Sequence, residues 1–219
     1  MLLKKIENIN GRRILLFTLF CVLMMNRYFI LNKPRNMVSQ FVSSHQVPLL
    51  GELPFQFPEG THAIGRLDKD SEGLLLLTTD KAITRLIFLG EKPHKRTYLI
   101  MVQNEMTEVA FKQLGNGINI KIKNGENYLA KPDSLLRISN AVSLYPWATD
   151  PREIYPHTWL LITLTEGKYR QVRKMALAIK HRCLRLIRLQ IENISIEGIS
   201  PGTVKELSKE DFYRLAGLN

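Results

Sequence analysis

Cysteine is scarce in this sequence of 219 residues, which contains only Cys21 and Cys183. The two lie far apart and neither belongs to a Cys-x-x-Cys pair, so we expect reduced thiols, with no zinc site and no disulfide framework. His62 and His94 stand alone, without the spacing of metal ligands. Glycine-rich phosphate-binding loops, repeats and low-complexity tracts are also missing. The sequence therefore predicts no metal and no small-molecule cofactor.

No hydrophobic run reaches the length of a membrane span. An apolar run at 14–25 follows several basic residues, but it is shorter than the roughly 20 residues that a bilayer requires. It resembles the apolar part of a signal peptide, yet no small-residue cleavage site follows it. A third interpretation is that translation starts at Met24 or Met25. We favour such a start, or an inert extension at 1–26, over membrane targeting, and expect one cytoplasmic domain at 27–219.

Positive charge dominates the composition. Lys and Arg number 31 against 20 Asp and Glu, which gives a formal net charge of +11. Hydrophobic residues make up 45% and charged residues 23% of the chain, as in ordinary globular proteins. An excess of this size indicates a polyanionic partner, either a nucleic acid or an anionic membrane surface.

Strand-like and helix-like segments are interspersed without a regular βαβ rhythm, which predicts an α+β fold. We expect one domain whose two lobes share one sheet. The pattern predicts strands at 27–32, 74–77, 98–102, 159–165 and 184–191, helices near 85–89, 107–114, from 172 and from 209, and paired strands within 116–145 with turns at Asn116-Gly117 and Asn124-Gly125.

Asp68 lies in the most informative stretch. The segment 68–73 reads as a turn, and four consecutive leucines at 74–77 follow it as a strand buried on both faces. Asp68 is thus expected on a loop fixed at one end by a rigid strand, where scaffolds often present reacting groups. An Asp in a turn is nevertheless more often a backbone-capping group than a catalyst, so this residue alone establishes no mechanism.

A second informative stretch is the basic segment 166–175. Apolar residues from Val172 onward follow the spacing of an amphipathic helix, with Arg170, Arg173 and Lys174 off the apolar stripe. These cations form either a solvated face or a helix start directed at anions. Other isolated residues are equally open: Lys33 and Arg35 are solvated or bind phosphates, and Tyr98 is a core residue, the lip of a cleft or a stacking platform.

Together these stretches resemble the pseudouridine synthases of ribosomal RNA, in particular type A of the small ribosomal subunit and types B, E and F of the large one. The similarity rests on several motifs in the family's order: Arg27 to Pro34, Gly65-Arg-Leu-Asp68 with Ser71 to Thr78, Arg96-Thr-Tyr98, Glu166 to Met175, and Leu184 to Arg188. Asn36, 39–41 and 151–153 resemble the type E branch, which lacks the N-terminal S4 RNA-binding domain of its relatives. Arg96 departs from the lysine common in the family; it keeps the charge but changes the geometry.

The resemblance implies the pseudouridine synthase fold, with a mixed, mainly antiparallel central sheet, flanking helices and a catalytic cleft. It implies isomerisation of uridine to pseudouridine in large-subunit (23S) ribosomal RNA by a monomer without metal or cofactor. The residue roles that it implies are as follows: Asp68 is the catalytic carboxylate, Arg173 pairs with it, Tyr98 stacks on the uracil and helps remove the C5 proton, Arg66 occupies the space that the flipped base leaves, Leu186 lines the pocket, and Lys33, Arg96, Lys168 and Arg170 bind RNA.

The sequence leaves two questions of mechanism and role open. Asp68 could act as a nucleophile or as a base. The alternative function is that of an RNA-binding ribosome-assembly factor on the same fold, whose catalysis is dispensable.

Overall fold

The computed structural model describes residues 25–89, 93–123 and 125–218. The expectation for residues 1–26 falls almost wholly outside this part of the chain. Within the described ranges, no helix combines the length and the hydropathy needed to cross a bilayer.

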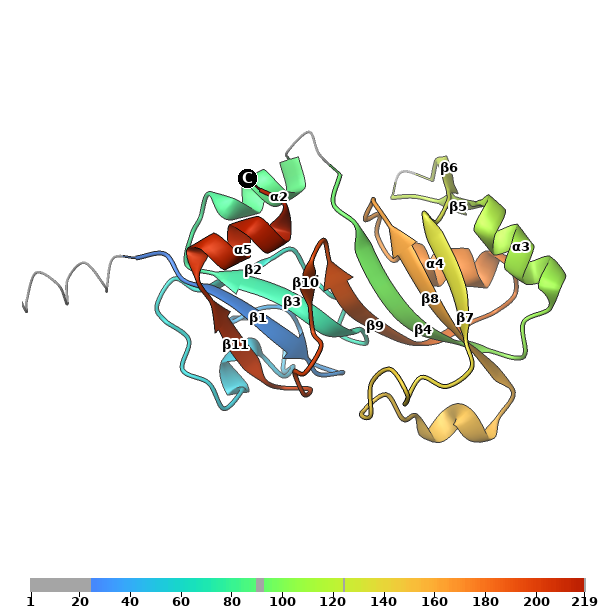
Figure 1. Cartoon of the computed structure of the whole chain (residues 1–219), viewed down its shortest axis with the longest axis horizontal. Helices are drawn as coiled ribbons and strands as arrows, with labels where there is room; N and C mark the ends of the chain where they lie inside the picture. Colours follow the sequence, from blue (N-terminus) through green and yellow to red (C-terminus); the bar gives the residue numbers. More distant parts are fainter. Residues whose placement is uncertain (1–24, 90–92, 124, 219) are drawn as a thin grey trace, which may run out of the picture.

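Short helices are interspersed irregularly among the strands along the chain (Figure 1). The strands are β1 (Tyr28–Lys33), β2 (His62–Ile64), β3 (Glu72–Thr78), β4 (Arg96–Gln103), β5 (Ile118–Lys121), β6 (Asn127–Ala130), β7 (Ser134–Ile138), β8 (His157–Leu164), β9 (Cys183–Ile191), β10 (Ile194–Ser195) and β11 (Val204–Leu207). The helices are α2 (Ile83–Leu89), α3 (Glu108–Asn116), α4 (Gln171–Ala178) and α5 (Lys209–Ala216), with 3-10 turns at Leu50–Glu52 and Pro151–Ile154.

One sheet runs through the described chain in the order β11-β1-β3-β9-β4-β8-β7, with β2 beside β3 and β10 beside β9. Its pairs are antiparallel except for β3 with β9, which run parallel. In Figure 1, β1, β3 and β11 lie in the left half and β4, β8 and β7 in the right half, with β9 between them. The predicted α+β class, with its mixed and mainly antiparallel central sheet, is confirmed.

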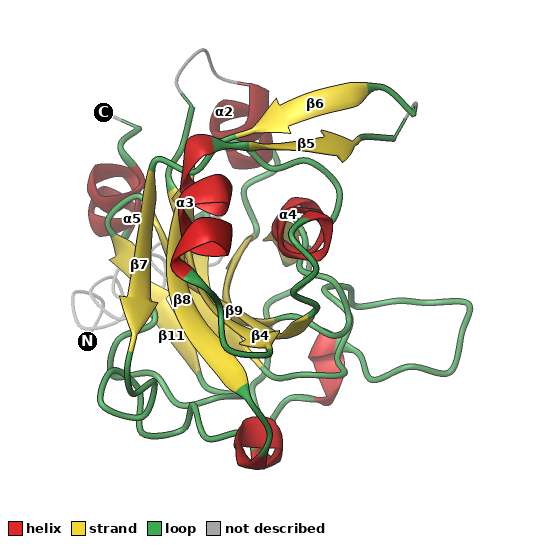
Figure 2. Ribbon diagram, turned by 90° about the vertical axis from the view of Figure 1, so that its right-hand side faces the viewer, coloured by secondary structure: helices red, strands yellow, loops and turns green. Residues whose placement is uncertain are grey.

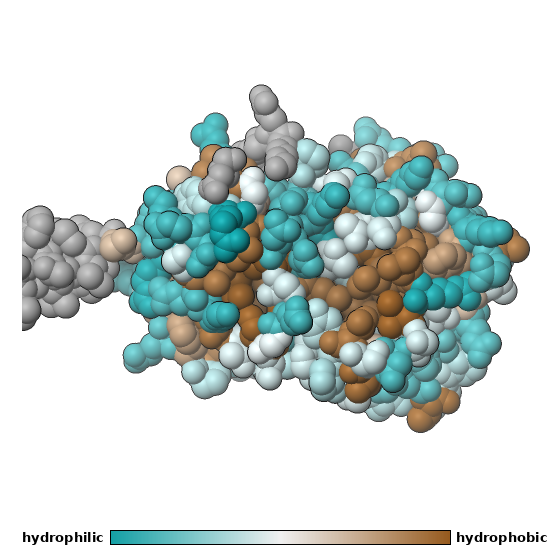
Figure 3. Space-filling model, viewed as in Figure 1, coloured by the Kyte–Doolittle hydropathy of each residue, from teal (hydrophilic) through white to brown (hydrophobic). Residues whose placement is uncertain are grey.

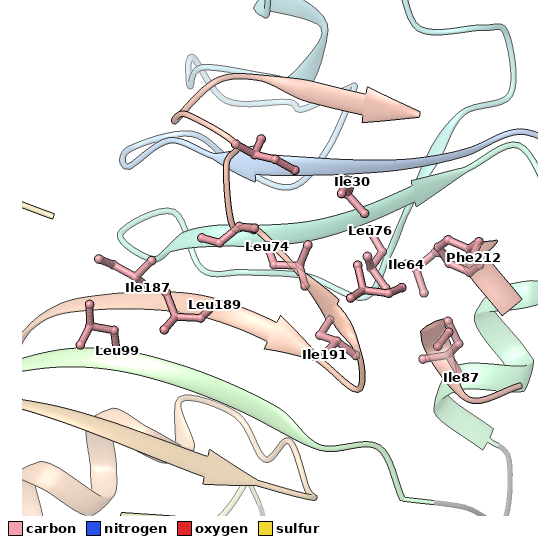
Figure 4. Packing of buried hydrophobic residues seen from close by; sticks show 14 of the residues in the cluster. Ile30, Ile64, Leu74, Leu76, Ile87, Leu99, Ile187, Leu189, Ile191 and Phe212 are labelled. Atoms are coloured by element: carbon pink, nitrogen blue, oxygen red, sulfur yellow. The ribbon is translucent and has the colours of Figure 1, made fainter. Parts of the chain in front are cut away.

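The leucine strand contributes to two cores, because successive side chains of a strand point to opposite faces. Leu74 and Leu76 pack with Ile187, Leu189 and Phe212 on one face (Figure 4), while Leu75 and Leu77 join a second cluster with Phe29 and Leu31. All four leucines are fully buried, as predicted. The strand is therefore held rigidly on both faces.

Helix α4 covers the sheet face opposite to α5 (Figure 2). The apolar stripe that begins at Val172 packs into a third cluster with Ile100 and Leu160, whereas Phe212 of α5 packs on the face that holds Leu99. Predicted periodicity and observed packing therefore agree for α4. Its first turn contacts the turn before β3, because Arg173 donates to the Asp70 carbonyl and to Ser71 Oγ.

The segment 116–145 differs from its prediction. The helix predicted at 107–114 continues to Asn116 as α3 and ends at Gly117, whose positive φ of 106° favours glycine. Asn124 of the predicted Asn124-Gly125 turn lies outside the described residues, but on either side of it the Ile122 N–H donates to the Glu126 carbonyl and β5 pairs with β6. The next strand, β7, joins the main sheet beside β8 instead. Asn116-Gly117 is thus a helix cap and not a hairpin turn.

Candidate active site

A cavity of about 710 Å³ opens where the turn before β3, the start of β4, the loop before α4 and strand β9 meet. Every site residue predicted from the sequence lines it except Lys33; the lining includes Arg66, Asp68, Arg96, Tyr98, Lys168, Arg170, Arg173 and Leu186. On the molecular face of Figure 3, hydrophobic residues are interspersed among hydrophilic ones and are more frequent over the half that holds β7 and β8. The cavity itself combines carboxylate, phenol and guanidinium groups in one place.

Asp68 occupies a turn that is anchored on both sides. Ser71 donates its backbone N–H to the Asp68 carbonyl at 3.0 Å, and β3 begins at the next residue. On the other side, the buried hydroxyl of Ser39 accepts from the Leu67 N–H and donates to the Leu67 carbonyl, each at 3.0 Å. The Asp68 side chain is 34% exposed. The predicted loop on a rigid strand is therefore present, and its carboxylate faces the cavity.

Arg170, and not Arg173, is the cation beside Asp68. Arg170 Nη1 lies 3.3 Å from Asp68 Oδ2, and its Nη2 lies 3.3 Å from Asp70 Oδ2. Arg170 precedes α4 in the left-handed conformation, with φ 51° and ψ 34°, which turns its side chain away from the helix surface and toward the turn. The predicted pairing of Arg173 with Asp68 is therefore wrong in this structure.

Arg173 binds the same turn but is less exposed than Arg170. Its Nη2 donates to the Asp70 carbonyl and to Ser71 Oγ, each at 3.1 Å, and lies 3.3 Å from Asp70 Oδ2. Burial opposes the ionisation of Asp70, but the positive charges of Arg173 and Arg170 hold the pKa of its carboxyl below the ordinary value. Asp70, to which the sequence assigned no role, is thus the carboxylate that both arginines share.

The opposite wall consists of strands. Tyr98 on β4 is nearly buried and lies directly across from Arg188 on β9 in the antiparallel register. Leu186, two residues before Arg188, therefore lies on the same face of the strand. Arg96 is also buried here and donates from Nη1 to the His94 carbonyl at 3.1 Å. The phenol, the leucine and two guanidinium groups face one space.

Lys33 is not available to a phosphate in this structure. Its side chain is fully buried, and its ammonium donates to the carbonyls of Pro34 and Met37 at 2.8 and 2.7 Å. Burial lowers the pKa of Lys33 to about 8, against the opposing negative charges of Glu72 and Asp70. The expected RNA contact of Lys33 is thus not supported, because carbonyls of the turn that follows β1 hold its ammonium inside the protein.

The loop before α4 is held by contacts that sequence reasoning missed. Glu166 accepts from the hydroxyl of Tyr128 on β6 and from Gln171 Nε2, and Gln171 Oε1 accepts from the Lys168 N–H at 2.9 Å. The Lys168 ammonium lies 4.9 Å from the centre of the Tyr128 ring. Tyr128 carries no local signal of this role.

Among the described residues, no group of three or more His, Cys, Asp and Glu side chains could hold a metal ion.

Comparison with known proteins agrees with this geometry. Residues 27–178 match the family model described as RNA pseudouridylate synthase. A Xanthomonas campestris protein named ribosomal large subunit pseudouridine synthase E is 33% identical over 177 residues, which cover 79% of this chain and 91% of the relative. A Vibrio vulnificus protein of the same name is 32% identical over 186 residues, 83% of this chain and 75% of the relative.

A solved structure extends the agreement to the whole architecture. A crystal structure of a pseudouridylate synthase superimposes with a TM-score of 0.68 at 26% sequence identity, covering 87% of this chain and 74% of that one. The region that matches the family model includes the Asp68 turn, Tyr98 and the start of α4. The fold, the motifs and the relatives point the same way: this chain belongs to the RNA pseudouridylate synthase family.

Proposed function

We propose that this chain isomerises a uridine of large-subunit (23S) ribosomal RNA to pseudouridine, with Asp68 as the reacting carboxylate. The observation that carries the proposal is the position of Asp68: its carboxylate faces a cavity of about 710 Å³, opposite Tyr98 and Leu186. The large-subunit substrate rests on the names of the Xanthomonas and Vibrio relatives. We place the enzyme in the cytoplasm, acting as a monomer.

The reaction detaches uracil from C1′ of the ribose, turns the base and rejoins it through C5. A base inside a helical stack cannot reach Asp68, so the target uridine must flip into the cavity, which costs a few kcal/mol of unstacking. Arg66 is exposed at the cavity lining and fills the space that the base leaves. In the cavity, the Asp68 carboxylate either attacks the nucleotide or accepts a proton from its sugar.

Tyr98 and Leu186 hold the flipped base between them. Both line the cavity and both are almost fully buried, so the Tyr98 ring and the Leu186 methyl groups form a rigid apolar slot. The Tyr98 hydroxyl assists the departure of the C5 proton after the base has turned. Arg170 places a positive charge 3.3 Å from the Asp68 carboxylate and offsets its negative charge before the substrate arrives.

Basic side chains at the rim bind the phosphates around the target nucleotide. Lys168 is exposed, Arg170 is half-buried, and both line the cavity. Each phosphate contact contributes about 0.7–0.9 to the slope of log affinity against log salt. Binding of the RNA should therefore weaken steeply as the salt concentration rises.

The test is chemical mapping of pseudouridine in ribosomal RNA from a deletion strain complemented with the wild type, Asp68→Asn or Asp70→Asn. We expect one uridine to lose its modification on deletion, and the wild type but not Asp68→Asn to restore it. Asp70→Asn is the matched control, since it removes the neighbouring carboxylate that the two arginines share, and it should restore the modification at least in part. Full restoration by Asp68→Asn would overturn the assignment of Asp68.

A ribosome-assembly factor whose catalysis is dispensable is the second candidate, and the same strains distinguish it. The net charge of +11 supports RNA binding independently of the chemistry. If growth and ribosome assembly fail on deletion but survive with Asp68→Asn, the binding function is the essential one. If both fail with Asp68→Asn, the chemistry is required.

A further inference from the structure

Arg188 is the least explained charged group in the described part of the chain. Its side chain is 5% exposed, and Nη2 has no hydrogen-bond partner. Nε donates to the Leu74 carbonyl at 2.8 Å, but Arg188 takes part in none of the ion pairs between the described residues. A buried guanidinium without a carboxylate is costly, and its unpaired donor requires an explanation.

The unpaired guanidinium belongs to the cavity. Arg188 lines it together with Tyr98 and Leu186, and the β4–β9 register places Arg188 directly across from Tyr98. Directly opposed residues of an antiparallel pair are close neighbours on one face of the sheet. A base held between the Tyr98 ring and Leu186 would therefore have the Arg188 guanidinium within its immediate surroundings.

The position of Arg188 is fixed by the strand that carries the reacting turn. Gly73 of β3 approaches the Arg188 backbone so closely that a Cβ there would overlap the Arg188 carbonyl. The bond from Nε to the Leu74 carbonyl then orients the guanidinium plane. Because both contacts come from the first residues of β3, Arg188 and Asp68 are held in one rigid unit. A donor fixed in advance is the arrangement that stabilises developing charge most strongly.

We propose that Arg188 is a catalytic residue, whose guanidinium donates to a carbonyl oxygen of the flipped uracil and stabilises the detached base. The proposal rests on the uridine isomerisation proposed above. When the C1′–N1 bond breaks, both of its electrons stay on the uracil, and the negative charge spreads over N1 and the two carbonyl oxygens. After the base turns, C5 supplies the electron pair of the new bond to C1′, the C5 proton leaves, and N1 gains a proton. No co-reactant is needed.

Burial strengthens this interaction. In the free enzyme, burial lowers the pKa of Arg188, because its guanidinium is removed from water and no carboxylate pairs with it. A uracil anion supplies the missing negative charge and the missing acceptor at the same time. The same donor disfavours a cytosine whose amino group occupies the position of the uracil O4, because two donors would then face each other.

The experiment measures single-turnover pseudouridine formation, together with kcat and KM, on a synthetic RNA fragment that carries the mapped uridine. Arg188→Gln should lower kcat about 100-fold, the effect of removing one preorganised donor, with KM changed less than about 3-fold. Arg185→Gln is the matched control, since Arg185 is a buried arginine of the same strand that is paired with Glu72 and lies outside the cavity lining. It should lower stability but leave kcat within about 3-fold.

Thio-substituted RNA provides the readout that a purely structural Arg188 would not change. Sulfur is a poorer hydrogen-bond acceptor, so 2-thiouridine or 4-thiouridine at the target should slow the wild type about 10-fold at the contacted position. In Arg188→Gln the same substitution should cost less than about 2-fold, because the contact is already gone. Additive effects at both positions would overturn the proposal. So would a wild type that neither thio substitution slows, which keeps the test decisive even if Arg188→Gln fails to fold.

Failure of this inference is distinguishable from failure of the proposed function. If the wild type forms no pseudouridine in any ribosomal RNA, the proposed function is wrong. If the wild type is active and Asp68→Asn is inactive, but Arg188→Gln keeps kcat within about 3-fold of the wild type, only the role of Arg188 is wrong.

Discussion

On the turn side of the cavity, Arg170 and Arg173 bind the carboxylates of Asp68 and Asp70, whereas on the strand side Arg188 is buried without a carboxylate. The turn side is also more exposed, with 34% of the Asp68 side chain accessible to solvent. Both walls of the cavity thus carry arginine, but the arginines of the turn side are paired with carboxylates and Arg188 of the strand side is not.

The difference separates two tasks that arginine performs. Where an arginine already has a carboxylate and carbonyls as partners, its charge is balanced and it shapes a turn. Where it is desolvated and only partly bonded, its charge remains available to a ligand. A family motif cannot separate these tasks, because both walls carry arginine in a recognisable motif. Only the structure shows which arginines are paired with carboxylates and which are not.

The largest expected effect comes from Gly73→Ala, which pushes the two walls apart. Gly73 has a φ of +97°, and a Cβ would overlap the Arg188 backbone. We expect a loss of about 5 kcal/mol in the free energy of unfolding, or failure to fold. Gly60→Ala is the control, because Gly60 has a φ of +78° with nothing within 4 Å, and should cost only about 1–2 kcal/mol. Equal losses in urea unfolding would show that the walls can separate freely.

Next is Glu72→Gln, which leaves Arg185 buried without its charge partner. Glu72 accepts from Arg185 Nε and Nη2 at 2.9 and 2.8 Å, and both side chains are 8% exposed. Removing one partner of such a pair costs about 3–5 kcal/mol. Replacing both, as Glu72→Gln with Arg185→Met, should recover part of that loss in thermal or urea unfolding. A single substitution that costs less than about 1 kcal/mol would contradict the pairing.

A smaller effect compares the two arginines of the turn side. Arg173 is 11% exposed and bonds the Asp70 carbonyl and Ser71 Oγ, so Arg173→Gln should cost about 2 kcal/mol of stability. Arg170 is 35% exposed, so Arg170→Gln should cost about 0.5 kcal/mol. Urea unfolding at one salt concentration measures both. If Arg170→Gln proves the more damaging, Arg170 is the deeper support of the turn.

The last effect is a pH dependence from Lys33. Its folded pKa of about 8 lies below the ordinary value of 10.5, so between these values the unfolded chain binds more protons than the folded one. Stability should therefore rise with pH in this window through Lys33 by about 1 kcal/mol per unit, and the slope from Lys33 should vanish below pH 8. Lys33→Met should remove that slope. An unchanged slope in the variant would show that Lys33 stays protonated in the folded state.

The periodicity of apolar residues correctly predicted the buried leucine strand and helix α4. Four adjacent leucines specified a doubly buried strand, and the stripe from Val172 specified α4, because burial on a strand or helix follows its period. Most of the cavity lining was predicted as well, but from the resemblance of its motifs to the family and not from local patterns. The burial of Lys33 was not predictable, because it depends on carbonyls and packing contributed by the folded turn.

The partner of Asp68 was a second feature that the sequence did not predict, because Arg170 lies where Arg173 was expected. Both residues belong to one motif, and their order along the chain does not indicate which one reaches Asp68. The left-handed backbone of Arg170 decides the pairing, and a non-glycine residue adopts that conformation only when the surrounding structure imposes it. The motif Leu184 to Arg188 likewise does not indicate that Arg188 lacks a carboxylate partner, because pairing depends on which side chains the fold brings together.

The order of strands in the sheet also has a consequence for synthesis on the ribosome. Strands β3 and β4 are neighbours in sequence but are separated in space by β9, and β1 lies between β3 and β11. The first half of the chain therefore emerges with strand edges that only its last third can cover, and such distant pairings form slowly. Asp68 meets Arg170 only after those later residues have left the exit tunnel. An enzyme that acts on ribosomal RNA would thus acquire its active site only after its own translation has passed β9.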